Sequence, residues 1–266
     1  MRNNLAVSLL ALKNKKNLNK FFSILKCENI RYVELPILKL FKNYSPSKKK
    51  LNVLKKKLKK NSLQITSIQA LFYGRENLSI FRINDTKDII NHLKKVIKIA
   101  KYFGASNLIF GSPNNRNLDN SNKADQLKNA LKLFKKIGQL CKKNKIYFII
   151  EPNAKIYNCN YINSIKQALN LIKIINSENI LINVDTGNIS LEREKLINYQ
   201  KKNKYFKNFQ ISEKNLADIR RSKFDHVKIL KKFDISNKII SLEMKDQKIS
   251  NLKSQIKKFK AIANNV

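Results

Sequence analysis

Four polar residues follow apolar stretches at similar intervals in the second half of the chain. The stretch 146–153 is rich in β-branched and aromatic residues and ends with Glu151 and a proline, which stops strand pairing. Asp185, Gln210 and Glu243 follow three similar stretches, at intervals of 34 (151 to 185), 25 (185 to 210) and 33 (210 to 243) residues. Because the carboxyl ends of parallel strands meet at one edge of a sheet, we expect these side chains to lie together.

Three carboxylates in one buried site repel one another and are costly to desolvate, so the set needs shared protons or a cation. An all-oxygen set suits Mg²⁺ or Mn²⁺ better than Zn²⁺, which generally takes His or Cys. The sequence therefore predicts a site for Mn²⁺ or Mg²⁺ with four ligands, Glu151, Asp185, Gln210 and Glu243. The alternative is that these residues lie on a rim and pair with the abundant lysines.

The intervals agree with the roughly 31 residues that each strand and helix occupy in an eightfold barrel of about 250 residues. Apolar and alternating patterns predict eight strands, at Leu5–Leu12, Arg31–Pro36, Leu63–Phe72, Asn107–Phe110, Ile146–Asn153, Ile180–Val184, Tyr205–Phe209 and Lys238–Leu242. Between and after them, helical patterns cover 18–25, Lys48–Lys60, a segment from Ile89 that ends at Gly104, Asn120–Asn144, Ser164–Ile175, Leu191–Gln200, Asp225–Lys232 and Ser250–Ala263.

These alternating elements predict an α/β fold, a single (β/α)8 barrel that takes up residues 1–266 as one domain. An open doubly wound sheet is the competing fold. It usually has a glycine-rich phosphate-binding turn after its first strand, and the sequence has no such turn. The segment Leu5–Leu12 is too short to span a membrane and is better interpreted as the first strand.

The composition is strongly basic, with 56 Lys and Arg against 18 Asp and Glu, and a formal net charge of +38. Such a charge is typical of proteins that bind nucleic acid or anionic membranes. Here 48 of the basic residues are lysines spread through every predicted helix, which indicates a compositional bias on solvated faces and no specific nucleic-acid site. Three cysteines without paired or metal-ligand spacing favour a reducing, cytoplasmic compartment.

Five motifs together resemble the xylose-isomerase-like TIM barrel family, which includes sugar-phosphate isomerases, ketose 3-epimerases and the endonuclease IV group. The resemblance covers most of the chain and is carried by the order and spacing of the motifs. They are Val33-Glu34-Leu35, Ile149-Ile150-Glu151-Pro152-Asn153, Val184-Asp185-Thr186-Gly187-Asn188, Phe209-Gln210-Ile211-Ser212-Glu213 and Ile240-Ser241-Leu242-Glu243.

The resemblance implies that the four strand-end residues bind one divalent ion and that Glu151 and Glu243 exchange a proton with the substrate from opposite sides. It thus implies a metal-dependent isomerase or epimerase that acts on a sugar or sugar phosphate through an enediolate. Two residues depart from the family pattern, because Gln210 and Asn188 stand where histidines are usual. These departures keep open a non-catalytic sugar-binding barrel that has lost its metal.

The endonuclease IV group assembles several zinc ions with many histidines, whereas this chain has only His92 and His226. A nucleic-acid-binding or DNA-repair protein is therefore the least favoured alternative, supported only by charge. We interpret His92 as a surface or packed residue within a helix. The expected partner is a small carbohydrate, with no specific nucleic acid and no membrane, and the oligomeric state stays open, a homo-oligomer included.

Further residues near the predicted strand ends are candidates for substrate binding. His226 begins the helix after the seventh strand, and helix amino termini in this fold face the active rim. Arg116 follows the fourth strand and can bind an anionic substrate group through its forked donors. The full set of predicted substrate-binding residues is Asn188, Arg116, His226, Glu34 and Asn153.

Overall fold

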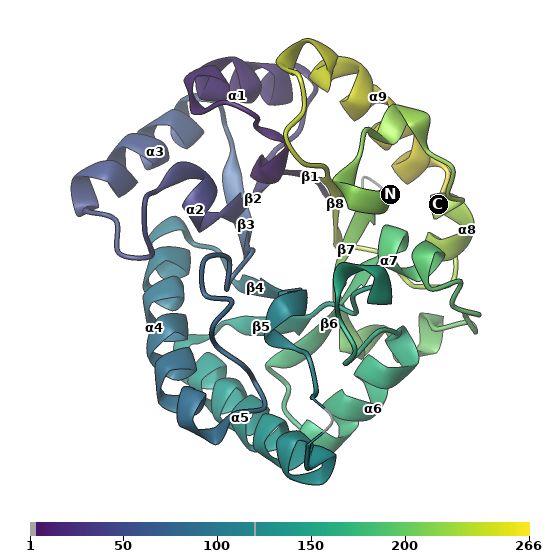
Figure 1. The fold of residues 1–266 in the computed structure, drawn as a ribbon. Helices are drawn as coiled ribbons and strands as arrows, with labels where there is room; N and C mark the ends of the chain where they lie inside the picture. The colour runs from purple at the N-terminus through teal and green to yellow at the C-terminus, as the bar shows by residue number, and fades with distance from the viewer. Residues whose placement is uncertain (1–3, 120) are drawn as a thin grey trace.

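The chain folds into a closed barrel of parallel strands with helices around its outside (Figure 1). The computed structural model describes residues 4–119 and 121–266, and within them eight strands pair in chain order, β8 closing onto β1. The predicted (β/α)8 TIM barrel is therefore confirmed. The strands are β1 Asn4–Ser8, β2 Tyr32–Pro36, β3 Gln64–Gln69, β4 Asn107–Phe110, β5 Tyr147–Ile150, β6 Ile180–Asp185, β7 Phe206–Ser212 and β8 Ile239–Glu243.

Helices surround the ring of strands, and the first and last of them, α1 and α9, lie side by side where the chain closes on itself (Figure 1). The helices turn apolar stripes toward the core. On α1 the stripe consists of Leu18, Phe21, Phe22 and Leu25. The helices are α1 Leu18–Cys27, α2 Ile37–Leu40, α3 Lys48–Lys60, α4 Thr86–Phe103, α5 Lys123–Asn144, α6 Ile165–Ile175, α7 Thr186–Leu191, α8 His226–Leu230 and α9 Leu252–Asn264.

Strand β4 and helix α3 have the bounds that the sequence predicts, and most other elements differ only at their ends. The predicted first residue of α5, Asn120, and residues 1–3 lie outside the described part of the chain. Of the two positions expected for His92, surface or packed, the structure shows the packed one, because its ring is buried and its Nε2 lies 2.7 Å from the Leu71 carbonyl oxygen. All three cysteines are free, and no helix of the described residues is long and apolar enough to cross a membrane.

The predicted helix Leu191–Gln200 is wrong. The helix after β6 is α7, Thr186–Leu191, which begins at the strand exit itself and ends where the predicted helix was expected to start. The Asp185 side chain accepts a hydrogen bond from the Asn188 backbone N–H and so caps α7. The sequence around Asp185 therefore ends a strand and begins a helix at once, and no loop separates the two.

Helix α7 lies against β7 because Gly187 has no side chain. A Cβ atom at this position would lie 2.6 Å from the Ser212 backbone oxygen and 2.3 Å from its Oγ. The close approach holds Ser212 beside Asp185, whose Oδ1 accepts a 2.9 Å hydrogen bond from the Ser212 hydroxyl. The glycine thus positions two residues of the strand ends.

We expect Gly187→Ala to lower the free energy of unfolding by roughly 1–3 kcal/mol, because the backbone of β7 must move to admit the methyl group. Urea denaturation measures this change. Gly138→Ala in α5 is the matched control: its Cβ would meet the Ser177 Oγ at 2.6 Å, a hydroxyl that can rotate away, and alanine favours the helix. A Gly187→Ala protein as stable as the control would contradict this account.

Candidate active site at the carboxyl end of the barrel

The four predicted metal ligands lie on consecutive strands at one end of the barrel. Glu151 directly follows β5, Asp185 ends β6, Gln210 lies within β7 and Glu243 ends β8. Asp185 is paired with Gln210 in the strand register, and Glu243 is paired with Ser212, two residues beyond Gln210. All four side chains are buried. The spacing in the sequence therefore placed them correctly at the same end, with Gln210 deeper than Glu243.

Glu151 is held by three amide groups. Its Oε1 accepts hydrogen bonds from the side chains of Asn153, at 2.8 Å, and Asn188, at 3.3 Å, and its Oε2 accepts one from Asn183 at 3.0 Å. Burial raises the pKa of Glu151 to about 8, and the nearby Asp185 carboxylate adds to the rise. The amides fix the position of this carboxyl group without supplying the charge that would ionise it.

Asp185 has one satisfied and one unsatisfied oxygen. Its Oδ1 accepts from the Asn188 backbone N–H at 2.7 Å and from the Ser212 hydroxyl. Its Oδ2 is buried and, among the described residues, has no hydrogen-bond partner. Burial raises the pKa of Asp185 to about 6. A buried carboxylate oxygen without a partner is costly and indicates a missing ligand.

Glu243 lies across the barrel from β3. Its Oε1 accepts a 2.5 Å hydrogen bond from the side chain of Gln69, at the end of β3. Burial raises the pKa of Glu243 well above its ordinary value, and repulsion from Glu151, Asp185 and Glu34 raises it further. Since β3 and β8 are not neighbours in the sheet, the Gln69 bond crosses the interior of the barrel.

The Gln210 amide is fixed at both of its ends. Its Nε2 donates a 2.8 Å hydrogen bond to Glu34 Oε2, and its Oε1 accepts from the side chain of Asn183. Glu34 also accepts from the Ser67 hydroxyl at 2.9 Å and from the Asn208 amide at 3.2 Å. Glu34 was predicted to bind substrate; the structure places it deep in the barrel, where burial raises its pKa.

The donor set has the chemistry of a site for a hard divalent cation. A cation beside Asp185 Oδ2 would supply the missing partner and offset the repulsion among Glu151, Asp185 and Glu243. In the arrangement that residues 4–119 and 121–266 adopt, no three His, Cys, Asp or Glu side chains lie close enough to hold a metal ion. Holding one therefore requires the carboxylates to draw together, whereas Gln210 Oε1, a carbonyl oxygen with two lone pairs, can keep its hydrogen bond from Asn183.

Arg116 lies in the segment that follows β4 and contacts residues of the site. Its guanidinium is fully buried 5.3 Å from the centre of the Phe110 ring and donates to the Glu151 backbone oxygen, at 2.9 Å, and to Asn153 Oδ1. Its Nε and Nη1 are buried without partners among the described residues, and burial lowers its pKa. Arg116 thus orients Asn153, which in turn donates to Glu151. Direct substrate contact by Arg116 and Asn153 stays a prediction.

His226 and Asn188 connect elements around the same end. His226 Nδ1 lies 2.8 Å from the Thr186 hydroxyl, and its Nε2 lies 2.8 Å from Glu213 Oε1. Both ring nitrogens therefore have partners within the chain, and the ring is buried. Asn188 accepts from the Ala154 backbone N–H at 2.9 Å while donating to Glu151. Substrate contact by either residue stays a prediction.

Two asparagines that the sequence analysis did not single out are central to the site. Asn183 connects Glu151 to Gln210, and its Oδ1 accepts a 3.0 Å hydrogen bond from Asn208. Each asparagine lies two residues before a predicted ligand, Asp185 or Gln210, on the same face of its strand. Asn183 and Asn208 are each a polar residue two positions before a predicted ligand in a largely apolar strand, and this pattern could have identified them in the sequence.

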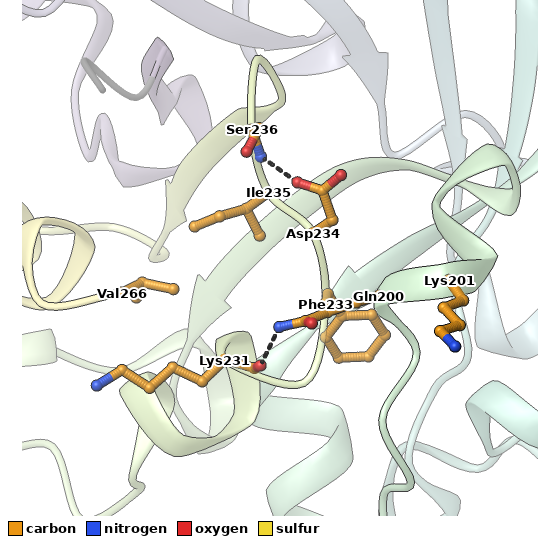
Figure 2. Close-up of a pocket in the computed structure, with 8 residues that line it drawn as sticks. All are labelled: Gln200, Lys201, Lys231, Phe233, Asp234, Ile235, Ser236 and Val266. Carbon is orange, nitrogen blue, oxygen red and sulfur yellow. Dashed lines mark hydrogen bonds between the residues drawn. The ribbon is translucent and has the colours of Figure 1, made fainter.

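A pocket of about 550 Å³ lies away from these residues (Figure 2). It is lined by Gln200 and Lys201, which precede β7, by Lys231 and residues 233–236, which precede β8, and by Val266. In Figure 2 the Asp234 carboxylate accepts a hydrogen bond from the Ser236 backbone N–H, at 2.9 Å. The pocket lies at the amino ends of the strands, whereas Glu151, Asp185 and Glu243 lie at the carboxyl ends.

Comparisons with known proteins agree with the fold. The family model described as xylose isomerase-like TIM barrel matches residues 24–262. No curated protein sequence matches the chain.

Solved structures with this fold cover nearly all of the chain. D-allulose 3-epimerase from Methylomonas sp. in complex with D-allulose has 14% identity and a TM-score of 0.76, over 100% of this chain and 98% of that one. A putative sugar phosphate isomerase/epimerase from Anabaena variabilis has 14% identity and a TM-score of 0.74, over 98% and 100%. IOLI protein with a binding zinc atom has 14% identity and a TM-score of 0.71, over 98% and 96%.

We expect the protein, kept free of divalent ions by a chelator, to become less stable as the pH rises from 6.5 to 8. Between the ordinary pKa of 4.5 and the folded pKa of about 8, folded Glu151 keeps a proton that the unfolded chain has lost. Glu243 acts in the same direction. The lowered pKa values of buried His92 and His226 act oppositely, and this effect fades as the unfolded histidines lose their protons, within about one pH unit above 6.5.

Urea denaturation at several pH values measures this slope, which is at most about 1.4 kcal/mol per pH unit for each carboxyl group. Glu151→Gln removes one titrating group, so its slope should be smaller than that of the unchanged protein. Stability that is constant or rises between pH 6.5 and 8 would contradict the buried, protonated state of these carboxyl groups.

Proposed function

Because the chain belongs to the xylose isomerase-like TIM barrel family, we propose that it is a sugar isomerase or epimerase that depends on a divalent metal ion. One observation carries the proposal: Glu151 and Glu243 are buried carboxyl groups of raised pKa, with Asp185 and Gln210 on the two strands between them. Similarity in fold to the D-allulose 3-epimerase and to the putative sugar phosphate isomerase/epimerase supports a sugar as substrate.

Glu151, Asp185, Gln210 and Glu243 would hold the ion, Mn²⁺ or Mg²⁺, which when bound supplies a Lewis acid that polarises a carbonyl oxygen. The unsatisfied Oδ2 of Asp185 supports this assignment. The zinc atom in the IOLI structure shows that a protein of this fold binds a metal, although our donor set, without His, favours a harder ion.

The two glutamates carry out the proton transfer. One carboxylate removes the proton from the carbon between the substrate carbonyl and hydroxyl groups, and the electron pair of that C–H bond forms the double bond of an enediolate. Return of the proton to the neighbouring carbon gives the isomer. Return of a proton to the opposite face from the other glutamate gives the epimer. Burial raises the pKa of both groups, and it brings that of Glu151 to about 8, where a carboxyl group can act as both acid and base near neutral pH.

The amides around Glu151 restrict its motion during this transfer. Asn153, Asn183 and Asn188 donate three hydrogen bonds to its two oxygens, and Arg116 holds both Asn153 and the Glu151 backbone oxygen. A general base needs a fixed position relative to the carbon it deprotonates. Glu151 is therefore the more rigidly held of the two glutamates, and Glu243 is held through Gln69.

A second candidate is a sugar-binding barrel without metal or catalysis. It is favoured by the hydrogen bond between Gln210 Oε1 and the Asn183 amide, which gives this oxygen a partner without a metal. Metal content separates the candidates. About one Mn²⁺ or Mg²⁺ per chain supports the enzyme, whereas no binding and no thermal stabilisation by added metal supports the binding protein.

We expect Glu151→Gln and Glu243→Gln each to lower the rate of exchange between sugar C–H and solvent deuterium by about 10²–10⁴-fold, because each removes one acid–base group. NMR of ketohexoses and their phosphates in D₂O, with Mn²⁺ or Mg²⁺ present, measures the exchange. Glu178→Gln makes the same chemical change at an exposed residue near the amino end of the barrel and should leave the rate unchanged. Unchanged exchange in either site variant would overturn the assignment.

A further inference from the structure

A second pocket lies at the same end of the barrel as the candidate active site. It has a volume of about 420 Å³ and is lined by residues that follow β1, β2, β3 and β8. Four of its lining residues are Lys13, Lys15, Lys39 and Lys245, and we call it the lysine pocket.

The lysine pocket adjoins the strand ends that carry the catalytic candidates. Lys245 lies two residues after Glu243, and Ala70, another lining residue, follows Gln69 directly. Gln69 is the residue that donates to Glu243 across the barrel. The lysine pocket and Glu243 therefore share the carboxyl ends of β3 and β8.

The charge of the lysine pocket is only partly balanced. Asp246 pairs with Lys39, with 2.5 Å between Nζ and Oδ1. Within the part of the chain that the structure describes, the ammonium groups of Lys13, Lys15 and Lys245 have neither a hydrogen-bond nor an ion-pair acceptor, although they line one concave surface. Three unpaired ammonium groups in a concave surface attract a polyvalent anion.

The other half of the same end has the opposite charge. Glu151, Asp185 and Glu243 lie there, buried at the carboxyl ends of β5, β6 and β8. Burial already disfavours negative charge on these carboxyl groups, so a further negative charge beside them is costly, and an anionic substituent of a sugar is favoured on the β1–β3 side, among the lysines. The two halves thus fit a substrate with a neutral reacting end and an anionic far end.

An exposed aromatic ring completes the rim. Tyr73 lines the pocket with 66% of its surface exposed, while the Tyr44 hydroxyl donates to its backbone oxygen at 2.8 Å. Tyr44 is buried and fixes the backbone at this point. The backbone that carries Tyr73 is therefore fixed at the pocket edge, from which the ring can pack its face against the apolar face of a sugar.

From these observations we infer that the lysine pocket binds the phosphate group of a phosphorylated sugar, whose reacting carbons lie between Glu151 and Glu243. A phosphate ester carries nearly two negative charges and three acceptor oxygens, which matches several lysines that approach from different loops. The inference rests on the proposed function for the choice of a sugar. The phosphate site itself rests on the pocket alone.

Because lysines are abundant in this chain, the test needs a control with the same loss of charge. A pocket of about 600 Å³ at the amino ends of β5, β6 and β7 is also lined by four lysines, among them Lys173 and Lys204. Lys204 lies over the Tyr205 ring, 5.2 Å from its centre. The double variant Lys173→Gln/Lys204→Gln removes two positive charges from this control pocket. It matches the test variant, Lys13→Gln/Lys245→Gln, because each variant removes two of the four lysines that line a pocket.

The first experiment titrates inorganic phosphate into the full chain by calorimetry at constant ionic strength. We expect the control variant to bind as the unchanged protein does and the test variant to bind at least about tenfold more weakly, since charged hydrogen bonds are lost. Equal binding by the test variant and the unchanged protein, or equal weakening in both variants, would overturn the inference.

The second experiment compares deuterium exchange of D-fructose and D-fructose 6-phosphate with metal present. We expect the phosphate ester to have the higher kcat/KM, and the test variant to raise KM for the ester alone. Equal kcat/KM for both sugars, unaffected by the test variant, would overturn the inference and leave the proposed function standing. Phosphate binding as expected without exchange on any sugar would overturn the proposed function and leave the phosphate site standing.

Discussion

The arrangement of side chains in the barrel interior depends on one constraint: buried carboxyl groups have lost their contact with water and need other partners. Four of them, Glu34, Glu151, Asp185 and Glu243, are almost fully buried at the carboxyl end, and burial raises the pKa of each. In the described residues near them, Arg116 is the cation that contacts a site residue, and it does so through backbone and amide oxygens. Amide and hydroxyl donors therefore carry most of the compensation, and among the described residues Asp185 Oδ2 is the carboxylate oxygen of this set that is buried without a partner.

A continuous chain of amides connects these carboxyl groups. Asn183 joins Glu151 to Gln210, Gln210 joins Asn183 to Glu34, and the last bond crosses from β7 to β2. A glutamine can take part because its amide has both donors and an acceptor. A neutral histidine has one donor and one acceptor, but both are fixed on a rigid ring. The hydrogen bond to Glu34 directs Nε2 toward β2 and leaves Oε1 as the atom that faces Glu151 through Asn183. The amide at this position thus turns its oxygen, and not its nitrogen, toward the side of the barrel that carries Glu151.

The sequence predicted what depends on periodicity and spacing. The barrel, β4 and α3, and the positions of Glu151, Asp185, Gln210 and Glu243 at one end follow from alternation, helical patterns and the regular interval between strand ends. The helix at Leu191–Gln200 was wrong because a cap by Asp185 starts α7 immediately, a local competition that periodicity does not report. Hydrogen bonds that cross the barrel, such as Gln69 to Glu243, join strands far apart in sequence and have no signature in either strand alone.

The net charge of +38 is informative through its position. Lysines cover the outer faces of helices such as α3, where solvent screens them, whereas the acidic side chains described above are concentrated inside the barrel at one end. The field of the whole protein therefore attracts anions everywhere, and selectivity arises only where lysines line a concave surface next to a chemical site. The lysine pocket meets that condition, because its unpaired ammonium groups lie beside the strand that ends in Glu243. The lysine-rich composition by itself suggests nonspecific anion binding. Under the proposed function, the lysines and the carboxyl groups at this end of the barrel act on opposite ends of one substrate.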